Sequence, residues 1–198
     1  MGLFFYFRLR KLYAGNNTIR YWSLFFLFFG LNAFAGLIKH GFNSYFSPEV
    51  NKWVWEFLNN LLNVPCAYAL LMANIEFSSM TPEKKKNMNL FVLLSSILFT
   101  VLIIIINKFW VGVINASVAM LITFIIHLIA YRRKTADTGM IVCGFGISFL
   151  SVFIHAAKIS VSDWFNHKDI SHVIIIISLI FIYAGVKRLE KGLFSGND

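Results

Sequence analysis

Long apolar runs separated by short polar breaks dominate the pattern of this chain. The runs cover residues 21–40, 53–75, 88–107, 109–131, 139–160 and 169–187. About 20 residues of helix cross the hydrocarbon core of a bilayer, so each run is long enough to span it. None of the runs shows the alternation of a membrane β-strand. The pattern therefore predicts an all-α integral membrane protein, a six-transmembrane-helix bundle that forms one domain over residues 1–198.

The composition agrees with this prediction. Of the 198 residues, 58% are apolar, 22 are phenylalanine and only 14% are charged, which is unusual for a soluble domain. The formal net charge of +9 would suggest nucleic-acid binding in a soluble protein. In a membrane protein it follows from the excess of Lys and Arg in cytoplasmic loops. We therefore expect membrane lipid, and no nucleic acid, as the partner, and the oligomeric state stays open.

The distribution of Lys and Arg predicts the orientation of the spans. With six spans, every even-numbered break is basic, and thirteen of the eighteen basic residues share one side of the membrane. That side carries Arg8, Arg10, Lys11, Arg20, Lys84, Lys85, Lys86, Arg132, Arg133, Lys134, Lys187, Arg188 and Lys191. Basic loops stay in the cytoplasm. We therefore expect an N-in, C-in multi-pass protein of the plasma (inner) membrane, with both termini cytoplasmic.

Polar residues recur at helical spacing in the outer halves of four predicted spans. The second span has one polar face, formed by Glu56, Asn59, Asn60 and Asn63 at i, i+3, i+4 and i+7. The other stripes are Asn32, Gly36 and His40 in the first span, Ser148, Ser151, His155 and Lys158 in the fifth, and Asp169 with His172 in the sixth. Polar groups are costly in lipid, so we expect these stripes to face inward and to pair with one another.

Four of the five histidines fall in this outer layer. His40 ends the first span, His155 lies near the outer end of the fifth, and His167 and His172 begin the sixth, whereas His127 lies near the inner end of the fourth. One interpretation is structural, with asparagines and histidines hydrogen-bonded across helices to fix their packing. The other is a metal site, because imidazoles and a carboxylate suit zinc with three protein ligands and one open position.

A zinc site in this layer would support hydrolysis, because bound zinc lowers the pKa of its water to about 7 and polarises a carbonyl group. The candidate metal ligands are His40, His155, His172 and His167. The candidate catalytic residues are Glu56 and Asp169, either of which could transfer a proton, and Ser151, which could stabilise an oxyanion. The candidate substrate-binding residues are Asn59, Asn60, Asn63 and Lys158.

Spacing restricts which residues of the sixth span can share a metal. His167 and His172 are five residues apart, which is about 140° around a continuous helix. They could bind one metal only if the helix begins after His167. Asp169 and His172 form the better pair, because they are i, i+3 neighbours on one face.

The layout resembles the CREST superfamily of membrane hydrolases, which includes alkaline ceramidases and adiponectin receptors. The resemblance lies in His40 in "GLIKHG" at the end of the first span, Glu56 at the start of the second, and His172 in "HKDISH" at the start of the last. It implies a zinc-dependent hydrolase of a lipid amide or ester, with six spans matching the seven-helix family without its first helix.

The chain departs from the family's motifs at several positions. The serine of the family's Ser-x3-His motif is replaced by Gly36, four residues before His40. The family's His-x3-His motif is absent, because Lys168 and Ile176 flank His172 at that spacing. A Ser-x3-His motif occurs instead as Ser151 to His155, in the fifth span. If zinc binds, the resemblance requires His155, His167 or Asp169 to replace the missing ligand.

Two further functions are consistent with the same residues. A b-type haem could be held by His40 together with His155 or His172 as axial ligands. A non-catalytic membrane protein, such as a sensor, small transporter or partner subunit, could use Lys39, Glu56 and Lys158 to line a polar pathway. The inverted repeats that are common in transporters are not visible in the sequence.

Overall fold

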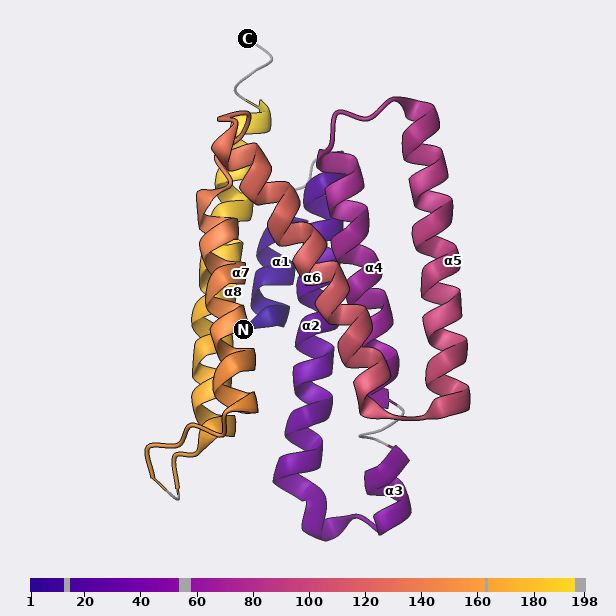
Figure 1. Cartoon of the computed structure of the whole chain (residues 1–198), viewed down its shortest axis with the longest axis vertical. Coiled ribbons are helices and arrows are strands. Elements are labelled where there is room, and N and C mark those ends of the chain that lie inside the picture. Colours follow the sequence, from indigo (N-terminus) through magenta and orange to yellow (C-terminus); the bar gives the residue numbers. More distant parts are fainter. Residues whose placement is uncertain (13–14, 54–57, 163, 195–198) are drawn as a thin grey trace. The chain divides into compact units, whose positions relative to one another are not determined.

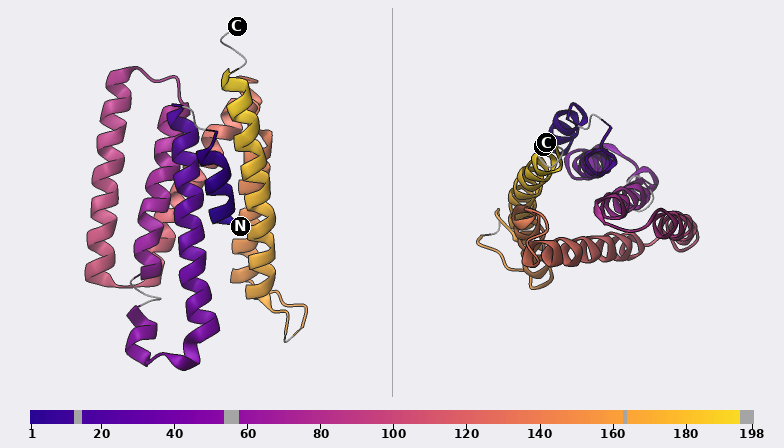
Figure 2. Two further views of the ribbon diagram at one scale, coloured as in Figure 1. Left: turned by 180° about the vertical axis from the view of Figure 1, so that it is seen from behind. Right: turned by 90° about the horizontal axis from the view of Figure 1, so that it is seen from above.

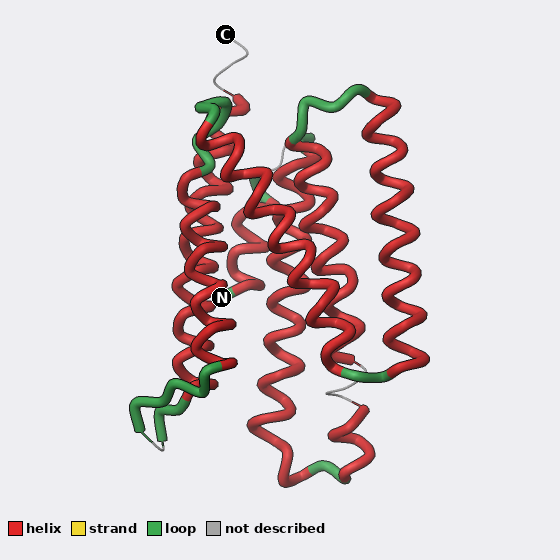
Figure 3. The backbone as a smooth tube through the Cα atoms, in the orientation of Figure 1, coloured by secondary structure: helices red, strands yellow, loops and turns green. Residues whose placement is uncertain are grey.

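The computed structural model of the chain consists of helices joined by short loops (Figure 1). It describes residues 1–12, 15–53, 58–162 and 164–194. In chain order the elements are α1 (Gly2–Arg10), α2 (Asn17–Phe42), the 3-10 helix η1 (Asn43–Tyr45), α3 (Pro48–Lys52), α4 (Asn60–Phe77), α5 (Pro82–Ile106), α6 (Phe109–Arg132), α7 (Gly139–Ala156) and α8 (His167–Phe194). The described residues contain no strand (Figure 3), so the prediction of an all-α protein is confirmed.

Five of the described helices are long and apolar enough to cross a membrane. These segments are Asn17–Ile38, Pro82–Ile106, Trp110–Arg132, Gly139–Ala156 and His167–Glu190. They coincide with five of the six predicted spans. The predicted span at 53–75 overlaps α4, which is not among the five because Asn60, Asn63 and Asn74 reduce its apolar character. The structure therefore supports a multi-pass membrane protein.

Local sequence signals fix both ends of α5. Before the helix, the hydroxyl of Thr81 accepts a hydrogen bond from the N–H of Lys84 (3.4 Å), and Pro82 occupies the first helical position. Both features favour a helix start. After the helix, Asn107 adopts a left-handed conformation with φ of 45°, and its N–H donates to the carbonyl of Ile103. The start of α5 at Pro82 and its end at Asn107 therefore have a local origin.

The chain divides into two compact units. The N-terminal unit (Met1–Thr123) contains α1 to α5 and the first part of α6. Within it, α4 packs against both α2 and α5. The short helix α1 packs on α2 where Gly2 meets Gly30, since a Cβ on Gly2 would come within 2.9 Å of the Gly30 Cα. The ring of Phe5 in α1 also contacts that of Phe26 edge-on, at 5.3 Å between centroids.

The C-terminal unit (Phe124–Asp198) is built on a hairpin of α7 and α8, whose axes run side by side (Figures 1 and 2). Its helices are in backbone contact: a Cβ on Gly144 would lie 2.9 Å from the carbonyl oxygen of Ser178, and a Cβ on Gly185 would lie 2.7 Å from the nitrogen of Ile141. Small residues at intervals of seven produce this contact. We call them the small-residue seam, and they are Gly144, Ser151, Ser171, Ser178 and Gly185.

Candidate functional site

A pair of histidines lies at the loop end of the α7–α8 hairpin. His155 is in the last turn of α7, and His167 is the first residue of α8. Their ring centroids are 5.2 Å apart and the rings are nearly perpendicular, at 63°. His155 is exposed and His167 is half-buried. Two of the predicted metal ligands, separated by a ten-residue connection and a helix end, are thus brought together by the fold.

The start of α8 is fixed by a reciprocal cap. The side-chain oxygen of Asn166 accepts a hydrogen bond from the N–H of Lys168 (2.9 Å), and Oδ2 of Asp169 accepts one from the N–H of Asn166 (3.0 Å). This is the arrangement of a capping box. The N–H of His167 donates to the hydroxyl of Ser160 (3.1 Å). The position of the His167 ring is therefore tied to a well-defined helix start, and one oxygen of the Asp169 carboxylate is engaged in the cap.

The end of α7 has an equally specific geometry. Lys158 adopts a left-handed conformation with φ of 53°. The N–H of Lys158 donates to the carbonyl of His155 (3.3 Å), and that of Ile159 donates to the carbonyl of Ile154 (3.1 Å). This pair of bonds is a Schellman motif, which usually carries glycine at the left-handed position. Lys158 thus terminates the helix beside His155, and its side chain is exposed.

His172, the third predicted ligand in this unit, is exposed on α8. Because α8 begins at His167 and not after it, His167 and His172 are on one continuous helix and point about 140° apart. The condition under which both could bind one metal is therefore not met. Among the described side chains, no group of three or more His, Cys, Asp or Glu residues is placed to hold a metal ion. His155 and His167 are in ring contact with each other, at 5.2 Å between centroids.

Ser151, predicted as a catalytic residue, lies in the small-residue seam. Its side chain is buried, and its hydroxyl donates to the carbonyl of Ser171 (3.3 Å). The hydroxyl of Ser171 lies 3.3 Å from the carbonyl of Ser151 and 2.6 Å from that of His167. The contacts between Ser151 and Ser171 join α7 to α8 one turn below the histidine pair. Ser171 therefore links the seam to the residue that carries the His167 ring.

The predicted substrate-binding asparagines lie in the N-terminal unit, between α2 and α4. The amide nitrogen of Asn32 donates to the side-chain oxygen of Asn63 (2.7 Å), whose own nitrogen donates to the carbonyl of Asn59 (3.2 Å). Asn59 and Asn60 are buried. We call Asn32, Asn59, Asn60 and Asn63 the asparagine cluster. Its members come from two of the four polar stripes, and they pair across the helices as such stripes do.

Gly112 of α6 gives the asparagine cluster its space. A Cβ at this position would come within 2.7 Å of the side-chain oxygen of Asn60 and within 3.1 Å of the side-chain nitrogen of Asn63. A hydrogen bond also joins α4 to α6 further along, where the side-chain nitrogen of Asn74 donates to the hydroxyl of Thr123 (2.7 Å). The polar side of α4 is thus packed against α6 as well as α2.

Two predicted residues lie outside this description. Glu56 is not among the described residues, and of His40 only the backbone, within α2, is described. Their predicted roles as proton donor or acceptor and as metal ligand stay predictions.

Several site residues were not found from the sequence. Asn166 was missed although Asn-x-x-Asp before an apolar run is a signal for a helix start. The polar stripes do not predict the seam, whose signal in the sequence is the small residues Ser171, Ser178 and Gly185, seven apart. Gly112 has no local signal, since its role depends on side chains of α4.

Comparisons with other proteins identify a family and no characterised relative. No curated protein and no solved structure matches the chain. A family model described as "Family of unknown function (DUF6962)" matches residues 1–191. The match covers nearly all of the 198 residues, and the chain therefore belongs to the DUF6962 family.

Proposed function

We propose that α4 is a sixth membrane span and that both termini are cytoplasmic. The 18 residues of α4 extend about 27 Å at 1.5 Å per residue, close to the thickness of the hydrocarbon core. The helix contacts α2 and α5, which are both candidate spans. An even number of spans also places the basic breaks on one side, as the distribution of Lys and Arg favours. A plasma (inner) membrane location is part of this proposal.

We further propose that the protein is a zinc-dependent intramembrane hydrolase of a lipid amide or ester. The observation that supports it is the pair His155 and His167. Two imidazoles bound to one tetrahedral zinc through Zn–N bonds of about 2.0–2.1 Å have ring centroids roughly 5 Å apart, and the observed separation is 5.2 Å. The donor set at the end of the hairpin therefore fits two of the three ligands of a catalytic zinc.

The pair accounts for two ligands, and the remaining ligand of the zinc stays a prediction. When bound, zinc would supply a Lewis acid for the carbonyl of the scissile bond. The chain's own contribution is orientation: the cap at Asn166 and the bond from Ser171 to the carbonyl of His167 fix the backbone that carries the His167 ring. Lys158, exposed three residues after His155, would attract an anionic lipid head group to this end of the hairpin.

Metal content is the test of this proposal. The protein is purified without chelator, and zinc is measured per chain in the wild type and in single alanine variants of His155, His167, His172 and His40. Lys168→Ala is the matched control, because Lys168 adjoins His167 without being a zinc ligand. We expect about one zinc per chain in the wild type and in the control, and loss on substitution of either member of the pair.

Activity is measured on the same samples with fluorescent lipid amides and esters in vesicles. Hydrolysis that requires zinc and both histidines supports the proposal. A wild type that binds no zinc after addition of the metal, or one whose zinc survives both His155→Ala and His167→Ala, contradicts it.

A non-catalytic multi-pass protein is the second candidate, and a specific observation favours it. Asp169 and Ser151, both predicted to be catalytic, have structural bonds in the α8 cap and in the seam. In that case the histidine variants alter stability or assembly and leave metal content unchanged. A haem held by His40 with His155 or His172 is distinguished by colour, since it requires a Soret absorption band in the purified protein.

A further inference from the structure

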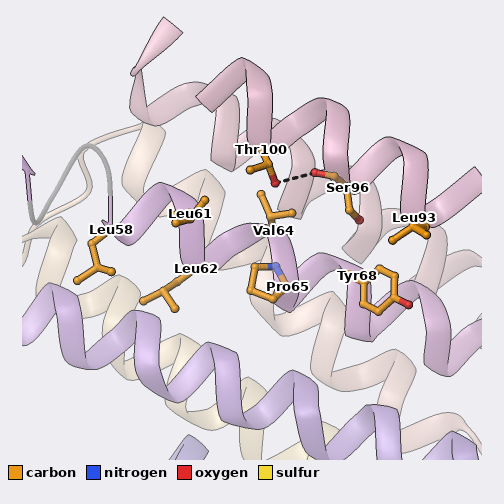
Figure 4. Close-up of a pocket in the computed structure, with 9 residues that line it drawn as sticks. All are labelled: Leu58, Leu61, Leu62, Val64, Pro65, Tyr68, Leu93, Ser96 and Thr100. Carbon is orange, nitrogen blue, oxygen red and sulfur yellow. Dashed lines mark hydrogen bonds between the residues drawn. The ribbon is translucent and has the colours of Figure 1, made fainter. Parts of the chain in front are cut away.

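A groove of about 420 Å³ lies between α4 and α5 in the N-terminal unit. Its walls include Leu61, Pro65 and Tyr68 from α4, and Leu93, Ser96 and Thr100 from α5 (Figure 4). Val64, which also lines the groove, clusters with Ile103 of α5. Beyond Tyr68 and Leu93, Met72 and Ile75 of α4 cluster with Val92 of α5.

The groove offers hydrocarbon and no free hydroxyl donor from α5. The hydroxyl of Ser96 donates to the carbonyl of Val92 (2.8 Å), and that of Thr100 donates to the carbonyl of Ser96 (2.8 Å). Both donors are therefore used within their own helix, as Figure 4 shows for the second bond. A polar ligand would lose its hydration against this wall without gaining a hydroxyl donor from α5.

The position of the groove along α5 determines what surrounds it. Ser96 is 14 residues after Pro82 in a 25-residue candidate span, or about 21 Å along the helix axis. This is within the roughly 30 Å of the hydrocarbon core and away from both ends of the helix. At this depth the surrounding medium consists of acyl chains and holds no water.

We propose that the groove between α4 and α5 is a binding site for one acyl chain of a membrane phospholipid. The walls are lined mainly by leucine, valine and proline side chains, which suit a hydrocarbon chain. The site would bind its chain whether or not the protein is a hydrolase, and its test does not involve metal or activity.

The test uses nanodiscs of phosphatidylcholine that contain a small fraction of phosphatidylcholine with a photoreactive diazirine midway along one acyl chain. After irradiation, mass spectrometry locates the cross-linked residues. We expect them to concentrate at the groove residues of α4 and α5, above the level at the exposed residues Leu94 and Leu98 on α5.

Two matched variants separate a binding site from ordinary boundary lipid. Ser96→Phe fills the groove, whereas Ser95→Phe adds the same volume one residue away, at a position that does not line it. We expect groove cross-links to fall about tenfold in Ser96→Phe, because filling displaces at least two methylene groups, and to persist in Ser95→Phe. Ser96→Leu replaces Ser96→Phe if the larger side chain prevents a monodisperse preparation. Even cross-linking around α5, or equal loss in both phenylalanine variants, overturns the proposal.

Discussion

The two units join their helices with different polar chemistry. In the N-terminal unit, polar side chains bond to each other across the helix interfaces, as in Asn32 with Asn63 and Asn74 with Thr123, both at 2.7 Å. In the C-terminal unit, serine hydroxyls donate to backbone carbonyls of the facing helix, as in Ser178 with Gly144 at 2.8 Å. The long amide side chains reach from one helix to the next, whereas the serine hydroxyl reaches a carbonyl where the backbones of α7 and α8 are in contact.

The difference between the two units shows that polar residues can join membrane helices in two ways. Both arrangements give polar side chains a partner on a facing helix, which stabilises them in a medium that cannot hydrate them. The asparagine cluster depends on its amide groups, which form the bonds. The small-residue seam depends on glycines, because they have no Cβ atom to separate the helices. The two regions should therefore respond to opposite kinds of substitution.

The largest effect is expected from adding one methyl group to the seam. In Gly144→Ala the new Cβ would meet the nitrogen of Ile182 and the carbonyl oxygen of Ser178, each at 2.9 Å. Backbone atoms cannot rotate away, so we expect a loss of about 1–3 kcal/mol in the free energy of unfolding. Reversible unfolding in mixed micelles measures this loss.

Gly146→Ala is the matched control on the same helix. No atom lies within 4 Å of a Cβ at Gly146, and alanine favours the helix over glycine. We expect no loss of stability there. Equal effects at Gly144 and Gly146 would show that α7 and α8 are not in the close contact described.

A smaller effect is expected where a glycine faces flexible side chains. In Gly112→Ala the new Cβ meets the amide ends of Asn60 and Asn63, at 2.7 and 3.1 Å. These groups can shift by leaving their preferred rotamers, which corresponds to about 1 kcal/mol. The same unfolding assay should therefore place Gly112→Ala below Gly144→Ala in its effect. A loss as large as that of Gly144→Ala would contradict the distinction between amide and backbone contacts.

The helices themselves were largely predictable from the sequence. Apolar runs of sufficient length predicted α2, α5, α6, α7 and α8, because crossing a bilayer imposes a length that few other structures require. The run at 53–75 predicted a span that overlaps α4, where Asn63 bonds to Asn32 of α2 and Asn74 bonds to Thr123 of α6. Helix α8 begins two residues before the predicted span, at the capping box formed by Asn166 and Asp169.

The contacts of the site were less predictable. Helical spacing shows which residues share one face of a helix, but it does not show which residues of another helix that face contacts. The stripe with Asn59, Asn60 and Asn63 was recognised, but its contact with Asn32 and Gly112 depends on tertiary packing. The proximity of His155 to His167 likewise follows from how α7 ends and α8 begins. No periodicity within either helix carries that information.

The amide bond between α2 and α4 can be isolated by a double-mutant cycle. Asn32→Ala and Asn63→Ala each remove one partner of the 2.7 Å bond, and the double variant removes both. Inter-helix hydrogen bonds in membrane proteins contribute about 0.6 kcal/mol on average, and we expect a coupling energy of that size. A coupling energy of zero would mean that the two amides do not stabilise each other.

The smallest effect is expected at Ser151, and it bears most directly on function. Ser151→Ala removes a donor whose bond to the carbonyl of Ser171 is long, at 3.3 Å. The backbone carbonyl of Ser151 remains in the variant and stays 3.3 Å from the hydroxyl of Ser171, so one contact between the two helices is kept. We expect a loss below about 0.6 kcal/mol in the free energy of unfolding, measured in the same assay as Gly144→Ala.

If Ser151 acts in hydrolysis, its alanine variant would lose activity at unchanged stability and zinc content. Ser171→Ala is the matched comparison, since it removes the hydroxyl on the other side of the same contact. A variant of Ser151 that retains full activity assigns the residue to the packing of the hairpin alone.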